Sequence, residues 1–430
     1  MSVALRNPFY QCQCARSDPI HDGSAAGRFP KITVLERKPE KMEPGYTLFR
    51  PRNHETGKFY VVILDNAADV VWYTGIPSNF DVRQLANGNL LFPFVTYFAE
   101  VNLLGETVRT WELPSEWSYH HEAFPTLHST FLYLSTETRL VENFPTSATE
   151  PDPPRETTLI HHLNVVMKFT RAGELKWILG PHENWAPEFQ PFLLTPVDTP
   201  FEWQYAQHAP MITPQGTLLL FDNGNHRASP PDPPVPDRAN YSRAVEYHIN
   251  EETMEVSQVW EYGGNNPERI YSGSRGDADW LSVRGNVLIT FADISFINGI
   301  RPSPFSVDAR MTRIIEVTHD AIPEVVFDIA VFDFGNENPE YEGVTSYRAR
   351  RIPDLYPTSV GVMSVSSSVR KMSVAWNAAP GYTYRISTSE DLVAWEPAAT
   401  IVATNATMSA ELDLVEANQF IRVERLHALQ

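Results

Sequence analysis

The feature that most constrains the fold is a recurring unit in which a glycine-containing turn leads into an apolar strand. VRQLANGNLLFPF (82–94), MITPQGTLLLFDN (211–223) and WLSVRGNVLITFAD (280–293) share this layout, and FPTLHSTFLYLSTE (124–137) is a degenerate copy. The glycine or asparagine at the turn supplies the positive φ that a tight hairpin requires. Each unit therefore predicts a β-hairpin.

A second unit follows these hairpins: a strand, a charged turn and another strand that often ends near tryptophan. It occurs as AEVNLLGETVRTWEL (99–113), VVMKFTRAGELKWILG (165–180), RAVEYHINEETMEVSQVWEYG (243–263) and RIIEVTHDAIPEVVFDI (313–329). Segments at helical period are almost lacking, so the pattern predicts an all-β fold. Four short strands recurring every ~40–50 residues are typical of propeller blades, and roughly 310 residues of repeat give about six blades. A long β-sandwich or a β-helix is the alternative.

Three regions follow from the change of pattern along the chain. Residues 1–44 are polar and rich in proline, which predicts a solvated N-terminal arm. Residues 45–357 carry the repeats and form the predicted catalytic β-propeller. Residues 358–430 alternate polar and apolar side chains, which predicts a small C-terminal β-sandwich of the fibronectin type III kind.

Charge and cysteine usage narrow the classes of partner. The 430 residues carry a formal net charge of −19, which disfavours nucleic acid and anionic membranes as partners. No apolar stretch is long enough to cross a bilayer. Cys12 and Cys14 are the only cysteines, and two thiolates alone do not make a zinc site. The first residues lack the apolar core of a signal peptide.

Histidines mark the candidate site. His120 and His121 lie in WSYHHEAF, His161 and His162 in LIHHLNVV, and His208 in YAQHAP. Each group stands directly before an apolar strand of a different predicted blade. Equivalent positions of successive blades converge at one end of a propeller channel, so these imidazoles are expected to be neighbours.

Arg227 decides which ligand such a cluster would take. Three imidazoles could bind zinc or manganese, but a permanent cation beside them raises the cost of binding a metal ion. Arginine and imidazolium together suit a tetrahedral oxyanion or a carboxylate. We therefore expect an anionic substrate, no metal and no cofactor.

Three segments resemble the bacterial arylsulfate sulfotransferases that work without a nucleotide sulfate donor. They are KWILGPHENWAPEF with LLTPVD, YAQHAPMITPQGTLLLFDNGNHR and YSRAVEYHINEETMEVSQVWEYG, and the likeness covers roughly residues 80 to 345. The resemblance implies a six-bladed propeller that moves a sulfuryl group from an aryl sulfate to a phenol through a sulfated histidine. It also implies a periplasmic or secreted protein.

The resemblance assigns roles to individual residues. His208 matches the family's glutamine-histidine element, and Arg227 matches the arginine of its DNG-x-x-R element. His162 resembles the histidine of a histidine-x-asparagine segment, and His121 the histidine before an earlier strand. These four are the predicted catalytic residues. The predicted substrate-binding residues are His120, Asn164, Tyr205, Asn223 and Tyr347.

The chain departs from the family at one position. The strand where the family carries its sulfated histidine reads GNVLITFADISFING (285–299) here, with Asp293 and Ser295 but no histidine. A covalent sulfuryl adduct is therefore expected on His121, His162 or His208.

Two other functions fit the same residues. A polysaccharide lyase could use histidine with Tyr205 or Tyr347 to abstract a proton while Arg227 neutralises a uronate, which would make an anionic glycan the substrate. A non-catalytic propeller that binds anionic ligands is the third reading. A homodimer is compatible with the sequence.

Overall fold

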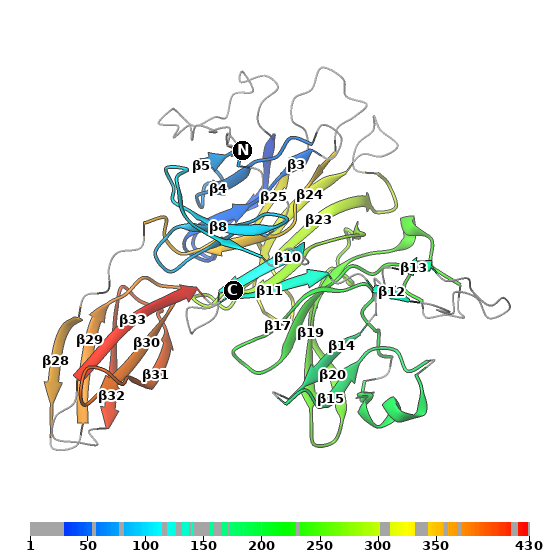
Figure 1. Cartoon of the computed structure of the whole chain (residues 1–430). Helices are drawn as coiled ribbons and strands as arrows, with labels where there is room; N and C mark the ends of the chain where they lie inside the picture. The colour runs from blue at the N-terminus through cyan, green and yellow to red at the C-terminus, as the bar shows by residue number, and fades with distance from the viewer. Residues whose placement is uncertain are drawn as a thin grey trace, which may run out of the picture.

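The computed structural model describes most of the chain between residues 30 and 428. The described residues are 30–53, 57–76, 81–113, 118–125, 131–136, 139–141, 155–157, 165–170, 172–183, 185–198, 200–228, 233–301, 310–331, 343–356, 360, 362–368, 371–413 and 420–428. Within these ranges the chain forms β-strands and two short 3-10 helices, η1 (Pro187–Phe192) and η2 (Asp237–Ala239) (Figure 1). The all-β prediction is confirmed, and no described helix is long and apolar enough to span a membrane.

Two four-stranded sheets lie in the N-terminal half. The first has the order β27 (Ala349–Ile352), β2 (Tyr46–Phe49), β4 (Val61–Leu64), β5 (Val70–Thr74). The second has the order β6 (Arg83–Gln84), β7 (Leu90–Pro93), β8 (Tyr97–Val101), β9 (Thr107–Glu112). Because β27 pairs with β2, the first sheet joins chain segments about 300 residues apart in sequence.

Two larger sheets lie further along the chain. One has the order β16 (Thr195–Pro196), β20 (Glu255–Tyr262), β19 (Arg243–Asn250), β18 (Leu218–Asp222), β17 (His208–Ile212). The other has the order β1 (Ile32–Arg37), β25 (Val325–Val331), β24 (Met311–Val317), β23 (Val287–Ile297), β21 (Ile270–Ser272), with β22 (Asp277–Trp280) also paired to β23.

Four pairs of strands stand outside these sheets. They are β3 (Arg52–Asn53) with β26 (Val344–Thr345), β10 (Ser118–Pro125) with β11 (Phe131–Thr136), β12 (Arg139–Val141) with β13 (Arg155–Thr157), and β14 (Val166–Phe169) with β15 (Leu175–Leu179).

In three of the sheets the two sequence units form successive hairpins, and the unit of residues 165–180 forms the separate pair β14–β15. The glycine-turn units form β6–β7, β17–β18 and β22–β23, and the charged-turn units form β8–β9, β14–β15, β19–β20 and β24–β25. The turn glycines have the expected positive φ, for example +89° at Gly88 and +82° at Gly216. Period-2 patterning and turn chemistry therefore located these elements correctly.

Apolar cores lie between neighbouring sheets rather than inside one. Leu48 of β2 shares a core with Phe92 of β7, and Leu288 of β23 shares another with Val62 of β4. The sheet that contains β18 packs in the same way against β15 on one face and against β22 and β23 on the other. No sheet closes on itself among the described residues, so the propeller ring stays a prediction.

Residues 30–44 of the predicted N-terminal arm contact later parts of the chain, whereas residues 1–29 lie outside the described part, so the arm as a whole stays a prediction. β1 pairs along its length with β25. Glu43 is only 4% exposed, and its carboxylate accepts the backbone N–H groups of Val283 and Arg284 at 2.9 and 2.7 Å. The charged side chains of this segment have partners in residues 283–326, which composition alone does not indicate.

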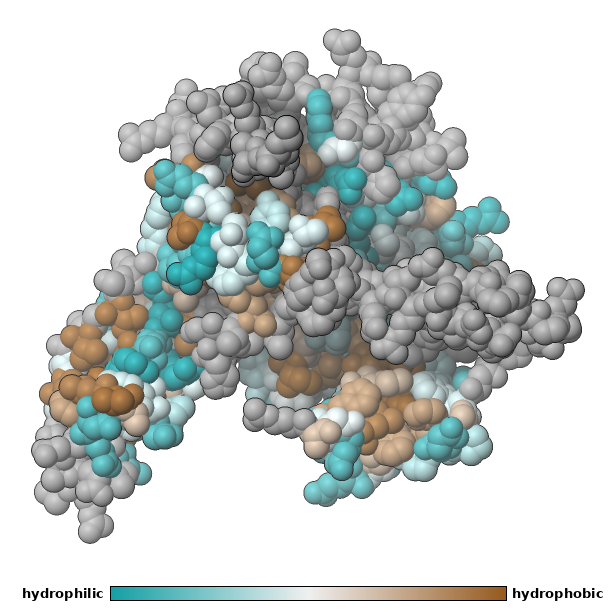
Figure 2. Space-filling view, in the orientation of Figure 1, coloured by the Kyte–Doolittle hydropathy of each residue, from teal (hydrophilic) through white to brown (hydrophobic). Residues whose placement is uncertain are grey.

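The C-terminal residues form two three-stranded sheets set to one side in Figure 1. Their orders are β28 (Val362–Ser367), β29 (Lys371–Asn377), β32 (Thr407–Asp413), and β31 (Glu396–Val402), β30 (Tyr382–Ser389), β33 (Phe420–Ala428). Trp376 and Tyr384, both almost fully buried, belong to one core that the two sheets share. Figure 2 shows further apolar side chains exposed on this part and on the part that contains β14. Phe169 of β14 is 53% exposed. A fibronectin type III relationship stays a prediction.

A buried group of charged side chains ties three sheets together. Arg350 of β27 donates to Asp81 at 2.7 and 3.2 Å, and its other terminal nitrogen lies 3.5 Å from Asp279 of β22. Asp277 lies 3.6 Å from Arg348 and 3.8 Å from Arg350. Buried ion pairs of this kind disfavour other packings of the three sheets, because any packing that left one of these charges buried and unpaired would cost stability.

One carboxyl of this group should make stability depend on pH. Burial and then the nearby Asp279 raise the pKa of Asp277 to about 7. Because folding raises this pKa, the neutral carboxyl is favoured in the folded state. Its contribution to the free energy of unfolding is complete below about pH 4 and is lost as pH rises through about 7. Asp277→Asn stays neutral at every pH. The melting temperature of this variant minus that of wild type should therefore be larger at pH 8 than at pH 5. Differential scanning calorimetry at both pH values tests this. A difference that does not change with pH, or the same change in the exposed control Asp237→Asn, would contradict it.

Candidate functional site

The candidate site is built on residues 202–228. This segment consists of the hairpin β17–β18, the loop before β17 and the turn after β18. Ala206, Ala209, His226 and Arg227 have positive φ although they are not glycine. Such backbone strain is held only where surrounding contacts fix it, and it is frequent at functional sites. Gly224 could not be replaced, because a Cβ there would lie 2.0 Å from the carbonyl oxygen of Tyr241.

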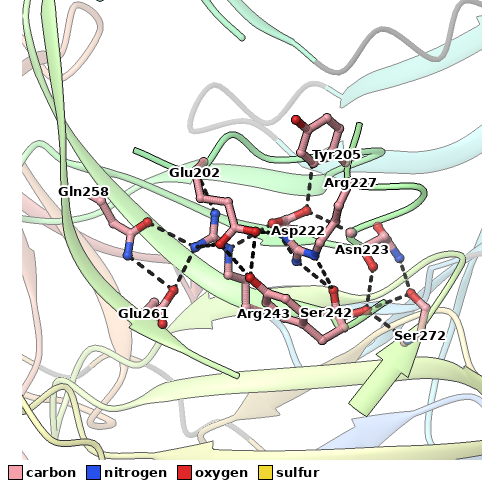
Figure 3. Close-up of polar contacts among 12 residues, drawn as sticks. Glu202, Tyr205, Asp222, Asn223, Arg227, Ser242, Arg243, Gln258, Glu261 and Ser272 are labelled. Carbon is pink, nitrogen blue, oxygen red and sulfur yellow. Dashed lines mark hydrogen bonds and ion pairs between the residues drawn. The ribbon is translucent and has the colours of Figure 1, made fainter. Parts of the chain in front are cut away.

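Asp222, at the end of β18, holds this segment in place. Its side chain is fully buried, and Oδ1 accepts the backbone N–H groups of Tyr205 and Gly224 at 2.8 and 2.9 Å. Oδ2 accepts Nη2 of Arg227 at 3.2 Å and Nε of Arg243 at 2.9 Å. One carboxylate thus joins the strand, the loop before β17 and the turn after β18 (Figure 3).

Arg227 is held by protein acceptors. It donates to Glu202 at 2.8 Å and to the carbonyl oxygen of Tyr241 at 2.7 and 3.1 Å, and its guanidinium lies 3.6 Å from the centroid of the Tyr241 ring. Burial alone would raise the pKa of Glu202, but the charges of Arg227 and then Arg243 lower it below its usual value. These contacts make Arg227 a positioning residue in this structure, and its predicted role as anion anchor stays a prediction.

His208 has a defined hydrogen-bond partner. Its Nδ1 lies 2.6 Å from Oδ1 of Asn223 and 3.2 Å from the carbonyl oxygen of Ala206. The amide nitrogen of Asn223 donates to the carbonyl oxygens of Ser272 and Arg275, both at 2.8 Å, which fixes the orientation of the amide. Since Nδ1 faces two acceptors, Nδ1 carries the proton and Nε2 carries the lone pair.

His121 approaches the same region from a different sheet. Its ring centroid lies 5.4 Å from that of Tyr347, and its own φ is +71°. The carbonyl oxygen of Tyr347 accepts the N–H of Gly276, the residue after Arg275, at 3.4 Å. A continuous set of contacts therefore runs from His208 through Asn223 and residues 275–276 to Tyr347 and His121.

The remaining predicted site residues are placed in part. Tyr205 is buried, and its backbone forms part of the Asp222 network described above. His162 and Asn164 lie outside the described residues, as does the side chain of His120. The convergence of all four predicted catalytic residues therefore stays a prediction.

Sequence reasoning missed a set of arginines close to this site. Arg275 follows β21, and Arg50 and Arg52 lie beside β26, which leads directly to Tyr347. Neither repeat unit contains these residues, so no signal in the repeat phase could have found them.

A hollow of about 540 Å³ opens beside the Asp222 network. It is lined by residues that include Glu202, Tyr241, Arg243, Glu261 and Arg269. The lining holds both charge signs, and Arg243 is already bonded to Glu261 at 2.8 Å. His208 is not among the residues that line this hollow. Because Arg243 of the hollow is already paired, we place the candidate chemistry at His208 instead. Among the described residues no group of three or more histidine, cysteine, aspartate or glutamate side chains could hold a metal ion.

Comparison with protein families identifies the chain's relatives. The sequence profile of the Arylsulfotransferase (ASST) family matches residues 31–152 and 158–341, which is more than half of the chain. The chain belongs to the arylsulfotransferase family. The matched residues include both hairpin repeats and the whole segment around His208 and Arg227.

Two curated members of the arylsulfotransferase family match part of the chain. Arylsulfate sulfotransferase AssT of Escherichia coli is 37% identical over 123 residues, which cover 25% of this chain and 20% of that protein. Arylsulfate sulfotransferase AssT of Lelliottia amnigena is 33% identical over the same length and coverage. The chain thus spans about a fifth of the length of these relatives in the alignment. A solved protein of unknown function from Bacteroides caccae aligns over 71% of this chain with 10% identity and a TM-score of 0.26.

The contacts of Arg227 predict a loss of stability when its planar guanidinium is replaced. Lysine keeps the charge but cannot bond Glu202, Asp222 and the carbonyl oxygen of Tyr241 together. We expect Arg227→Lys to lower the free energy of unfolding by about 1–3 kcal/mol. Urea denaturation measures this, with Arg238→Lys in exposed η2 as the matched control. Equal midpoints for wild type and Arg227→Lys would contradict a positioning role.

Proposed function

We propose that this arylsulfotransferase moves a sulfuryl group from an aryl sulfate to a phenolic acceptor, with His208 as the nucleophile. Family membership supports sulfuryl chemistry at a general level. The observation that favours His208 is its bond to Asn223, which directs the Nε2 lone pair away from the supporting amide. A neutral imidazole oriented by a second group is the arrangement that activates histidine in other enzymes.

The proposed reaction has two steps. First, Nε2 of His208 attacks the sulfur of the aryl sulfate, an N–S bond forms, and the S–O bond to the aryl group breaks to release a phenolate that takes up a proton. Then a second phenol loses its proton and attacks the same sulfur, and the N–S bond breaks to regenerate neutral histidine. In the sulfated intermediate Nδ1 keeps its proton and donates a hydrogen bond to Oδ1 of Asn223, which stabilises the positive charge of the ring.

We propose His121 as the group that accepts the proton from the second phenol. Its positive φ and its contact with Tyr347 support a functional position, because such strain persists where the fold fixes it. Tyr205 and Tyr347 would contact the aryl groups, and His162, His120 and Asn164 keep the roles that the family resemblance implies.

We also propose that the sheets of residues 30–356 are the blades of a six-bladed propeller. Support comes from the cores, which join neighbouring sheets pairwise: β7 with β10, β2 with β7, β4 with β23, β22 with β18, and β18 with β15. The remaining contact would lie between β10–β13 and β14–β15. The β2–β27 pairing would then close the ring, since it joins an early strand of this region to its last strand. A periplasmic or secreted location is part of the same proposal.

Covalent capture tests the nucleophile. After brief incubation with 4-nitrophenyl sulfate and acid quenching, we expect the intact mass to rise by one sulfuryl group and the adduct to map to His208. His208→Ala should lose the adduct and at least about 10³-fold in transfer rate. His226→Ala is the matched control, because His226 is exposed on the adjacent turn and should leave both readouts unchanged. An adduct on another residue that persists in His208→Ala would contradict this assignment.

Asn223 offers a second test, which separates positioning from folding. Asn223→Leu keeps the side-chain volume but cannot accept the Nδ1 proton, so the tautomer is no longer fixed. We expect kcat to fall about 10- to 100-fold, with a changed pH profile and little change in KM. An unchanged pH profile of kcat would contradict a role for Asn223 in setting the protonation of His208.

A further inference from the structure

Three arginines that the reaction above does not use gather beside the site. Arg52 pairs through its backbone with Thr345, and the hydroxyl of Ser346 donates to the carbonyl oxygen of Arg50 at 3.1 Å. Residues 345–347 lead to Tyr347, whose carbonyl oxygen is bonded to Gly276. The backbone of Arg50 and Arg52 therefore contacts residues 345–346, and Arg275 directly precedes the residue that is bonded to Tyr347.

The side chains of these arginines have few partners in the part of the chain that the structure describes. Arg50 is only 4% exposed, and its Nε and Nη2 are buried without a hydrogen-bond acceptor; Nε of Arg52 is in the same condition. Among the described residues no carboxylate forms an ion pair with Arg50, Arg52 or Arg275. Asp293 is nearby, but its oxygens bond to Arg310 and Ser274.

The three charges are close enough to repel one another. Burial lowers the pKa of Arg50 to about 9, and the charges of Arg52 and then Arg275 add to the effect. Burial likewise lowers the pKa of Arg275; the charge of Asp293 opposes this effect, and the charges of Arg52 and Arg310 add to it. A buried guanidinium with unmet donors costs stability, so such a group is kept where a ligand completes it.

We propose that Arg50, Arg52 and Arg275 form a binding site for a tetrahedral oxyanion of the sulfate or phosphate class. A doubly charged anion with four oxygens matches three planar guanidinium groups, each of which can donate two parallel hydrogen bonds. The site is distinct from the Arg227 network, whose arginine already has acceptors. It is coupled to His208, because the carbonyl oxygen of Arg275 accepts the amide of Asn223.

The proposal does not depend on sulfuryl transfer, since binding can be measured without turnover. Two sources could supply the anion: a free inorganic ion, or an anionic group carried on the aryl substrate. Competition distinguishes them, because an ion that occupies the substrate's own position raises KM for the aryl sulfate without changing kcat.

The test is thermal unfolding with inorganic sulfate titrated against sodium chloride at matched ionic strength. We expect sulfate to raise the melting temperature of wild type beyond the effect of chloride. Arg50→Gln and Arg52→Gln should each weaken sulfate affinity at least about tenfold. Arg238→Gln, an exposed arginine on η2, is the matched control and should behave as wild type.

A second readout separates a ligand site from a structural arginine. In sulfate-free buffer, Arg50→Gln should melt at the same temperature as wild type or higher, because it removes a buried charge that has no counter-ion. A lower melting temperature in that buffer, or a sulfate response equal to that of chloride, would overturn the proposal. Phosphate in place of sulfate should give a response of the same kind, and loss of that response in Arg52→Gln confirms that the arginines are its origin.

Discussion

The carboxylate of Asp222 is the interaction on which the arrangement of the site depends. It is fully buried, yet it accepts two backbone N–H groups and two guanidinium donors, so both oxygens are satisfied. A charge in that position is tolerated only with all of these partners together, because each missing donor would leave a desolvated lone pair. The backbone around residues 205–208 and 222–227 is therefore fixed as one unit. His208 and Asn223 belong to that unit, and their mutual geometry follows from it.

The sequence predicted local structure well and tertiary partners poorly. Hairpins such as β6–β7 were predictable because alternation along a strand and a glycine at the turn are properties of a few adjacent residues. Placing His208 and Asn223 near each other required only that β17 and β18 form a hairpin. The contacts of residues 30–44 could not be predicted because the partners of Glu43 lie more than 200 residues away in the sequence.

The arginines show the same limit in the site itself. Arg227 could be selected from its motif, but its acceptors come from three separate positions, Glu202, Asp222 and Tyr241. The groups around a guanidinium decide whether an arginine binds a ligand or bonds to other parts of the protein. A sequence motif does not contain that information. Arg50 and Arg227 are both largely buried, but among the residues that the structure describes only Arg227 of the two has carboxylate partners.

The pairing of β2 with β27 also has a consequence for biosynthesis. Strand Tyr46–Phe49 leaves the ribosome early, but the residues that cover its edge, Ala349–Ile352, are translated about 300 residues later. β1 likewise cannot pair until β25 has been translated. During translation, two strand edges therefore present unpaired N–H and C=O groups that could pair with another nascent chain. Contacts so distant in sequence slow folding, so these edges stay exposed for longer than the edges of local hairpins.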